Sequence, residues 1–159
     1  QLPLLIPCLL HTFSPANIQG DSVITIEHLP GGGFTDEKLP KALIIRTLPN
    51  GDGKKSKDWA NTNPTYLHSD FTNKLVERGV EHLLVDLPSV DKEIDGGTLL
   101  SHKAFFGVPE APRTEATITE FVFIPNDVQD GLYALNLQLA PFDLDASPSR
   151  PVIYPLLVI

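Results

Sequence analysis

Apolar residues gather in short runs along the chain, separated by polar stretches rich in glycine, proline and aspartate. Short apolar runs bounded by such residues are typical of buried or half-buried strands rather than of helices. The runs that predict strands lie at residues 2–10, 23–27, 42–47, 82–87, 118–124, 132–140 and 152–159. The first run contains prolines, which are typical of an edge strand. The pattern therefore predicts more sheet than helix.

The clearest helical pattern follows a long polar segment, residues 49–63, which predicts a solvated loop. Ser69 or Asp70 can cap the start of this helix, and Gly79 ends it. The helix lies between two predicted buried strands, so the pattern indicates a crossover connection between them. A second helical segment, carrying His102, follows a Gly-Gly break.

The remaining segments predict loops and turns. They lie at residues 14–21, 29–33, 108–117, 125–131 and 143–151. The glycine run at residues 31–33 is not followed by the Lys-Ser or Lys-Thr pair of a phosphate loop, so we interpret it as a turn. In the last loop, an ion pair between Asp145 and Arg150 would brace the turn.

The length, net charge and cysteine count narrow the class of protein. A length of 159 residues predicts one domain, residues 1–159, large enough to bury a core. The net charge of −8 argues against nucleic acid or an anionic membrane surface as a partner. No apolar run reaches the roughly 18 residues that a spanning helix needs. The single cysteine, Cys8, excludes an intrachain disulfide and fits a reducing compartment, so we expect a cytoplasmic protein.

The sequence contains no methionine and begins with Gln1. We therefore expect the chain to begin inside a domain and to lack an N-terminal segment. Strands on the N-terminal side should then lack partners and expose apolar surface. This predicts association with the absent segment or with another copy, and hence a homo-oligomer.

The candidate chemistry lies in residues 81–106, where an apolar strand leads through an acidic loop to a helical segment. In α/β proteins such loops carry side chains to the end of a sheet. Ser89, Asp91 and His102 have the residue types of a catalytic triad. However, no Gly-x-Ser-x-Gly elbow is present, and Pro88 precedes the serine, so the pattern favours a local turn over a nucleophile.

A metal site is the second candidate. No HExxH or similar close pair occurs among the five histidines, His11, His28, His68, His82 and His102. His102 follows the acidic loop, and Glu120 interrupts an otherwise apolar row of alternate positions, so these two are the candidate ligands. A buried carboxylate needs a cation, a metal or a raised pKa. An ion pair with Arg46 or Arg113 would satisfy Glu120 equally well.

Three blocks of sequence carry a family resemblance: RGVEHLLVDLPSVD, then SHKAFFG, then ITEFVFIPNDVQDGLYALNLQLAPFDLDASPSRPV. In this order they resemble the C-terminal part of the cyclase family of metal-dependent hydrolases, which includes the bacterial kynurenine formamidases. The resemblance implies an α/β fold, a swivelling β/β/α domain with a strand-rich mixed sheet and few helices. The N-terminal HxGTHxDxPxH-type motif that supplies most metal ligands in the family is absent here.

Matched block by block, the family's later ligands fall on His102 and Glu120. The gap between them is longer than usual, through an insertion at residues 109–116, so Glu115 remains a rival for the glutamate. The resemblance further implies that His102 binds metal or transfers the proton to the leaving group. Zinc or manganese is the expected ion.

The resemblance implies hydrolysis of an amide, ester or lactone by metal-activated water, as in a formamidase acting on a C–N bond. The expected partner is a small-molecule substrate, with no nucleic acid and no membrane. A different function remains open: a catalytically silent domain of the same fold, used for binding or assembly. The absence of the N-terminal motif motivates this alternative.

Overall fold

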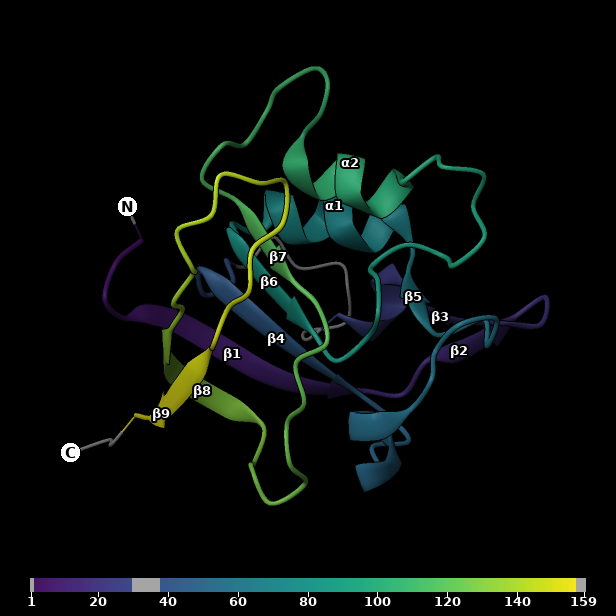
Figure 1. Cartoon of the computed structure of the whole chain (residues 1–159), viewed down its shortest axis with the longest axis horizontal. Helices are drawn as coiled ribbons and strands as arrows, with labels where there is room; N and C mark the ends of the chain where they lie inside the picture. The colour runs from purple at the N-terminus through teal and green to yellow at the C-terminus, as the bar shows by residue number, and fades with distance from the viewer. Residues whose placement is uncertain (1, 30–37, 157–159) are drawn as a thin grey trace.

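The computed structural model describes residues 2–29 and 38–156, and it contains two sheets and two α-helices (Figure 1). The larger sheet has the strand order β7-β6-β4-β1-β8-β9, and the smaller has the order β2-β3-β5. Parallel and antiparallel pairs occur in both, so the predicted strand-rich, mixed α/β architecture is confirmed. The strands are β1 (Ile6–Phe13), β2 (Ala16–Ile18), β3 (Asp21–Ile24), β4 (Ala42–Thr47), β5 (Tyr66–Leu67), β6 (His82–Val85), β7 (Thr117–Thr119), β8 (Gly131–Asn136) and β9 (Val152–Pro155). The helices are α1 (Ser69–Glu77) and α2 (Leu100–Phe106), with 3-10 turns η1 (Ile26–His28) and η2 (Asp52–Ser56).

The centre of the large sheet is parallel. Strand β4 pairs in parallel with β1 on one side and with β6 on the other, and all six of its residues are buried. Helix α1 lies between β4 and β6 in the sequence, as the predicted crossover requires. A strand buried on both faces reads as a continuous apolar run, which is why β4 and β6 were recognisable from the sequence.

Strand β1 is a central strand, so the edge position predicted from its prolines is wrong. It pairs with β4 and, antiparallel, with β8. Pro7 lies opposite Ala134 of β8, while the pairing with β4 begins only at Cys8. The proline is tolerated because at this position β1 has a paired neighbour on only one side.

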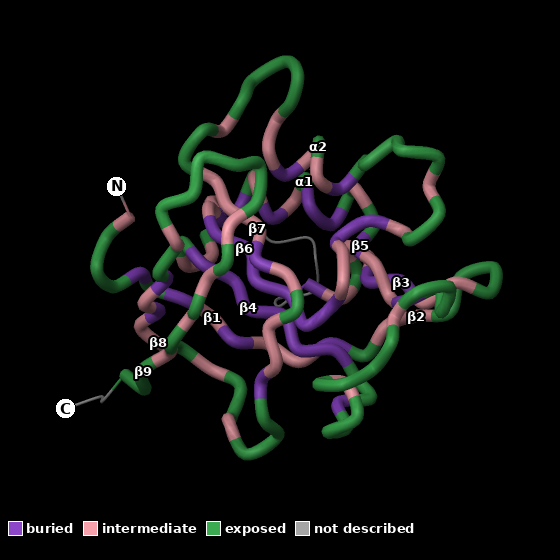
Figure 2. The backbone as a smooth tube through the Cα atoms, in the orientation of Figure 1, coloured by how far each residue is buried: buried purple, intermediate pink, exposed green. Residues whose placement is uncertain are grey.

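Each face of the large sheet carries its own core. Leu43 and Ile45 of β4 contact the first core, which contains Phe71 of α1 and Phe105 of α2, because both helices cover that face (Figure 1). Ile44 belongs to the second core, which is closed by segments that follow β7. Buried backbone is accordingly concentrated along the central strands (Figure 2). The period-2 alternation of a strand distributes these side chains between the two cores.

The small sheet begins with a hairpin in residues 14–21, where the sequence predicted a loop. Strands β2 and β3 are antiparallel, and the two residues that connect them, Gln19 and Gly20, have φ values of 53° and 94°. Positive φ at both central positions is the mirror-image turn that suits a tight hairpin. Strand β2 is too short and polar to be recognised by alternation. Strand β3 overlaps the strand predicted at residues 23–27, but it ends at Ile24, because the chain turns into η1 at Ile26.

The predicted cap of α1 is wrong, whereas the glycine predicted to end the helix is confirmed. The residue that caps α1 is His68 rather than Ser69 or Asp70, and its side chain accepts a hydrogen bond from the Asp70 amide at 3.3 Å. Gly79, with φ of 89°, follows the helix as expected. The predicted glycine turn lies outside the described residues except for Leu29.

The strand predicted at residues 118–124 is wrong in its length. Strand β7 ends at Thr119, and Phe121 has a left-handed φ of 59° that breaks the extended conformation. The backbone stays beside β6, because the Phe121 and Val122 amides donate to the carbonyls of Leu87 and Val85. Glu120 therefore lies just beyond a strand rather than inside one.

The end of the chain follows the prediction more loosely. Strand β8 stops at Asn136, and the chain then folds back on itself through an isolated bridge between Leu139 and Ser149. The Ser147 hydroxyl donates to the Ala140 carbonyl at 2.6 Å and helps to close this loop. Among the residues described, no Asp145–Arg150 ion pair is present, so that expectation is wrong.

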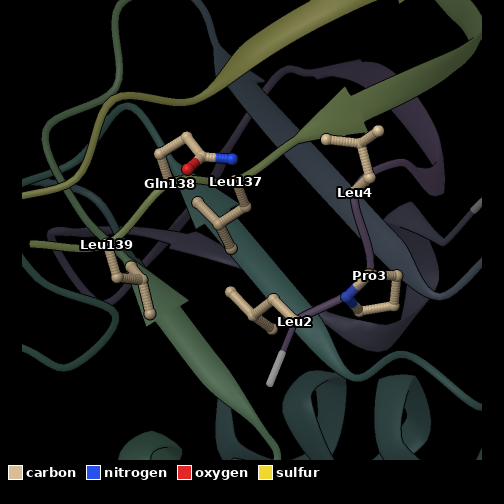
Figure 3. Close-up of a pocket in the computed structure, with 6 residues that line it drawn as sticks. All are labelled: Leu2, Pro3, Leu4, Leu137, Gln138 and Leu139. Carbon is tan, nitrogen blue, oxygen red and sulfur yellow. The ribbon is translucent and has the colours of Figure 1, made fainter. Parts of the chain in front are cut away.

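An apolar hollow of about 420 Å³ lies between the N-terminal arm and the segment after β8 (Figure 3). Leu2, Pro3 and Leu4 line one side, and residues 137–139 line the other. Leu4 is 75% exposed. The prediction of an unpaired N-terminal strand is wrong, since β1 is paired on both sides, but apolar side chains are exposed next to it. Within residues 2–29 and 38–156, no helix is long and apolar enough to span a membrane.

A buried ion pair anchors the long loop after β4 to the sheet. The Lys54 ammonium donates to Asp86 Oδ2 at 2.7 Å and to the Thr47 carbonyl at 2.7 Å. The Thr47 amide and hydroxyl also donate to Asp86, each at 2.8 Å. The side chains of Lys54 and Asp86 are 12% and 1% exposed. The pair therefore fixes the loop at the carboxyl ends of β4 and β6.

We predict that Asp86→Ala lowers the free energy of unfolding by about 3–5 kcal/mol, because it leaves the buried Lys54 ammonium unpaired. Urea unfolding followed by circular dichroism measures this. Asp52→Ala is the matched control, since it breaks the exposed pair with Lys55 and should leave the midpoint unchanged. Equal midpoints for the two variants would contradict a stabilising role for the Lys54–Asp86 pair.

Candidate functional site

The Asp91 carboxylate connects the loop after β6 to the start of α2. Its oxygens accept hydrogen bonds from the amides of Ser101 at 2.6 Å and His102 at 3.2 Å. They also bond the His102 ring at Nδ1, 2.7 Å away. The residue before α2, Leu99, has a left-handed φ of 49° and caps the helix with no side-chain bond. Asp91, ten residues from Ser101, therefore satisfies the free amides that a local cap would normally satisfy.

The other carboxylates of the acidic loop accept hydrogen bonds from backbone amides. Asp95 accepts from the amides of Leu99 and Gly97, each at 2.7 Å, and these bonds lower its pKa. Glu93 accepts from the amides of Asn61 and Asn63, at 2.6 and 2.9 Å. Together with Asp86, these side chains give the loop a fixed shape, so His102 is presented from a rigid support.

His102 and Glu120 face one another at this end of the sheet. The His102 Nε2 atom lies 3.6 Å from Glu120 Oε1. Their side chains are 28% and 29% exposed, so both are partly removed from water. The Val90 amide donates to Glu120 Oε1 at 3.1 Å. In the neutral ring, Nδ1–H donates its hydrogen bond to Asp91, so the unprotonated Nε2 faces Glu120.

The electrostatics of the three groups are linked. The hydrogen bond with Asp91 is the largest cause that raises the pKa of His102, and the charge of Glu120 raises it further. Burial of the ring opposes both effects but does not cancel them. Burial opposes ionisation of Asp91, but its bonds with the His102 ring and the Ser101 amide outweigh it, so the pKa of Asp91 is lowered. Burial raises the pKa of Glu120, and the Val90 amide and His102 offset this only in part. A carboxylate in this state favours a nearby positive charge.

The competing partners of Glu120 are engaged elsewhere. Arg46 donates to Asp130 and to the carbonyls of Pro125 and Val128, each at 2.8 Å. Arg113 donates to the carbonyls of Phe105 and Val80. The alternative of an arginine ion pair is therefore wrong.

The remaining candidates are also placed. Glu115 is exposed, and its charge acts on His82 rather than on His102. The Ser89 hydroxyl accepts from the Asp91 amide at 3.1 Å, which is the local turn contact expected of it. Since His102 Nε2 faces Glu120, the described residues do not assemble a Ser89–His102–Asp91 triad.

The described residues supply part of a metal site. In the ranges 2–29 and 38–156, no group of three or more histidine, cysteine, aspartate or glutamate side chains could hold a metal ion. His102 Nε2 and Glu120 offer one nitrogen and one carboxylate donor. Zinc accepts both types of ligand, but its catalytic sites have about three ligands from protein. That His102 and Glu120 bind a metal stays a prediction.

Comparison with curated proteins identifies relatives of known name. The kynurenine formamidase of Bacillus cereus is 36% identical over 115 residues, which are 72% of this chain and 49% of that enzyme. The Bacillus anthracis enzyme is 35% identical over the same shares of the two chains. The chain is a distant homologue of kynurenine formamidase. It spans about half the length of the curated relatives it matches. No protein-family model matches it.

Two solved structures share the fold of this chain. A protein described as a potential metal-dependent hydrolase with cyclase activity superposes with a TM-score of 0.64 at 19% identity, covering 94% of this chain and 65% of that one. A predicted metal-dependent hydrolase from Bacillus stearothermophilus superposes with a TM-score of 0.63 at 18% identity, covering 94% and 63%. These similarities establish the fold, and the resemblance to the cyclase family is confirmed.

We expect His102 in the metal-free protein to titrate above its ordinary pKa of about 6.5. The stability that this shift contributes is fully present below about pH 6.5 and is lost as the pH rises through the folded pKa. Asp91→Asn removes the largest cause of the shift, so the His102 midpoint should fall. Proton–nitrogen NMR of the ring in the presence of a chelator measures it. Asp70→Asn, which alters an exposed carboxylate beside His68, is the control. A His102 midpoint that is equal in all three proteins would show that Asp91 does not set the His102 pKa.

Proposed function

We propose that this chain supplies part of a metal-dependent hydrolase with the swivelling β/β/α fold, acting on a C–N bond as formamidases do, or on an ester or lactone. The observation that carries the proposal is the 3.6 Å separation of His102 Nε2 and Glu120 Oε1 at the end of the sheet. The kinship with kynurenine formamidase supports the class of reaction. A small-molecule amide is the proposed substrate.

The donor set fits zinc or manganese. Asp91 holds the Nδ1 side of His102, which leaves Nε2 as the ligand atom, an arrangement common around metal-bound histidines. Burial raises the pKa of Glu120, and a cation relieves the cost of its charge. A divalent ion, when bound, supplies an activated water and polarises the scissile carbonyl. The remaining ligands would come from outside the described residues.

The roles of the chain's own residues follow from their contacts. The Val90 amide and the Ser89 side chain hold Glu120, so its carboxylate has a fixed position opposite His102. Asp91 keeps the His102 ring in one orientation and stabilises its protonated form. If Nε2 is not a metal ligand, the same arrangement lets His102 donate a proton to the leaving group.

One observation favours a second candidate function. The residues that the structure describes contain no three-ligand group, so a domain with the cyclase fold that binds or assembles without catalysis also fits. A hydrolysis assay distinguishes the hydrolase from the silent domain, because only a hydrolase would lose activity when Glu120 is replaced.

We further propose that the chain associates with another copy of itself. Exposed apolar side chains gather near the N-terminal arm and the outer strands β8 and β9, including Leu4, Leu5, Leu132 and Tyr154. Exposed apolar surface of this kind favours association. Size-exclusion chromatography with light scattering should give a mass above the 17.4 kDa of one chain. A stable monomer at all concentrations would contradict this part of the proposal.

Formanilide hydrolysis with added zinc or manganese tests the enzymatic proposal. Glu120→Gln should lower metal-dependent hydrolysis by about 100-fold or more, because it removes the charge of a ligand. Glu115→Gln is the matched control, since that glutamate is exposed and lies away from His102, and its rate should stay unchanged. Equal rates in the two variants would contradict the assignment of Glu120. Hydrolysis that does not depend on added metal would contradict the metal-dependent mechanism.

A further inference from the structure

The loop after β4 contains the single Asn-Gly pair of the sequence, Asn50–Gly51. In such a pair the glycine amide nitrogen can attack Cγ of the asparagine side chain, because glycine has no Cβ to obstruct the approach. The five-membered ring that forms releases ammonia, and water then opens it to aspartate or isoaspartate. The reaction consumes one water, releases one ammonia and replaces a neutral amide with a carboxylate.

The attacking group, the Gly51 amide, is unobstructed. Gly51 is exposed, and its φ of −85° and ψ of 156° are extended backbone. Within residues 2–29 and 38–156, no group accepts a hydrogen bond from its amide. A Cβ built on Gly51 would meet nothing within 4 Å. The nitrogen is therefore free to react once Asn50 Cγ reaches it.

The Asn50 side chain, in contrast, is held in place. It is only 5% exposed, and its Nδ2 donates to the Ile124 carbonyl at 2.9 Å and to Asn126 Oδ1 at 2.8 Å. Asn126 Nδ2 donates to the Asn50 carbonyl at 2.9 Å, so the two residues bind each other reciprocally. Both partners of Asn50 Nδ2 are acceptors, which fixes the orientation of the amide. Any rotation of this side chain breaks these bonds.

The same contact has one unfavourable feature. Asn50 Oδ1 is buried and accepts no hydrogen bond from the described residues, and it is the one such side-chain atom among them. An unsatisfied buried acceptor destabilises the closed arrangement, and rotation into water satisfies it. Asn126 is exposed, so the contact lies at the surface. Local opening of the loop, without unfolding of the sheet, is therefore enough to release Asn50.

The product of the reaction does not fit the closed loop. An ionised carboxylate at position 50 has no N–H group for the Ile124 carbonyl or for Asn126 Oδ1, and it brings a charge into a buried place beside these two oxygens. The Asn50 contacts join the loop after β4 to the segment that follows Glu120. Deamidation should therefore leave the two segments separated.

We propose that Asn50 is a site of spontaneous deamidation whose rate is set by opening of the Asn50–Asn126 contact, and that the carboxylate product keeps the loop after β4 detached from residues 124–126. The chemistry needs only water and the chain itself. It is independent of the proposed hydrolase function, so either can fail without the other.

Peptide mapping by mass spectrometry, during incubation at neutral pH, tests the rate. Asn126→Ala should deamidate at residue 50 at least about fivefold faster than the unaltered protein, because the reciprocal bonds no longer oppose opening. Gln129→Ala is the matched control, since that exposed amide in the same segment donates to the Asp127 carbonyl and not to Asn50, and its rate should stay unchanged. Equal rates in the two variants, or no deamidation at residue 50 in Asn126→Ala, would overturn the proposal.

Gly51→Ala tests the chemistry in the same assay. The added Cβ fits the loop but obstructs the attack, so deamidation at residue 50 should slow at least about tenfold, also when it is combined with Asn126→Ala. An undiminished rate would show that Gly51 is not the attacking group and would overturn the assignment.

Asn50→Asp reproduces the charge of the product and tests its effect on the loop. Amide hydrogen exchange in residues 48–57 should be at least about tenfold faster than in the unaltered protein, with exchange in β4 and β6 unchanged. Asn17→Asp is the matched control, because Asn17 Oδ1 accepts from the Gly20 amide and a carboxylate can do the same. Unchanged exchange in Asn50→Asp would overturn the claim that deamidation detaches the loop.

Discussion

The Asp91 carboxylate is the constraint on which the candidate site depends. It is nearly buried, yet it is ionised, because the His102 ring and two amides at the start of α2 compensate for the lost hydration. A single side chain thereby fixes the entry into α2, the orientation of His102 and the tautomer of its ring. Nothing local could do this, since Leu99 provides no side-chain cap. The remaining contacts place Glu120 against the ring so oriented.

A second set of polar contacts fixes the loops that surround the site. Asp86, Glu93 and Asp95 each accept hydrogen bonds from backbone amides, and Asp86 also forms an ion pair with Lys54. What reads in the sequence as an acidic, solvated loop is thus a set of separate anchors. This explains how a segment without regular secondary structure can hold side chains at the carboxyl ends of β4 and β6 with little freedom.

The parts of the fold that the sequence predicts are those decided by burial. Strands β4 and β6 and helix α1 have apolar patterns that only one kind of element fits. Strand β1 was misplaced because its prolines indicate an edge, and only the register against β4 shows why Pro7 is tolerated in the centre. The end of β7 was missed because the left-handed backbone at Phe121 is imposed by contacts with β6, and phenylalanine gives no sign of it.

Some features of the candidate site could likewise be predicted from the sequence, and others could not. His102 and Glu120 were indicated by a polar residue in an apolar row and by a family resemblance, and the structure brings them within 3.6 Å. The link between Asp91 and the ring depends on how the loop folds back onto α2, so the sequence offered Asp91 only as the acid of a triad.

Anomalous diffraction from crystals of this chain soaked in manganese or zinc tests the central claim most directly. The account predicts one anomalous peak within coordinating distance of both His102 Nε2 and Glu120, about 2.0–2.2 Å for zinc. The peak should disappear in Glu120→Gln and persist in Glu115→Gln. A peak that avoids this pair, or its absence at millimolar metal, would contradict the assignment of His102 and Glu120 as ligands.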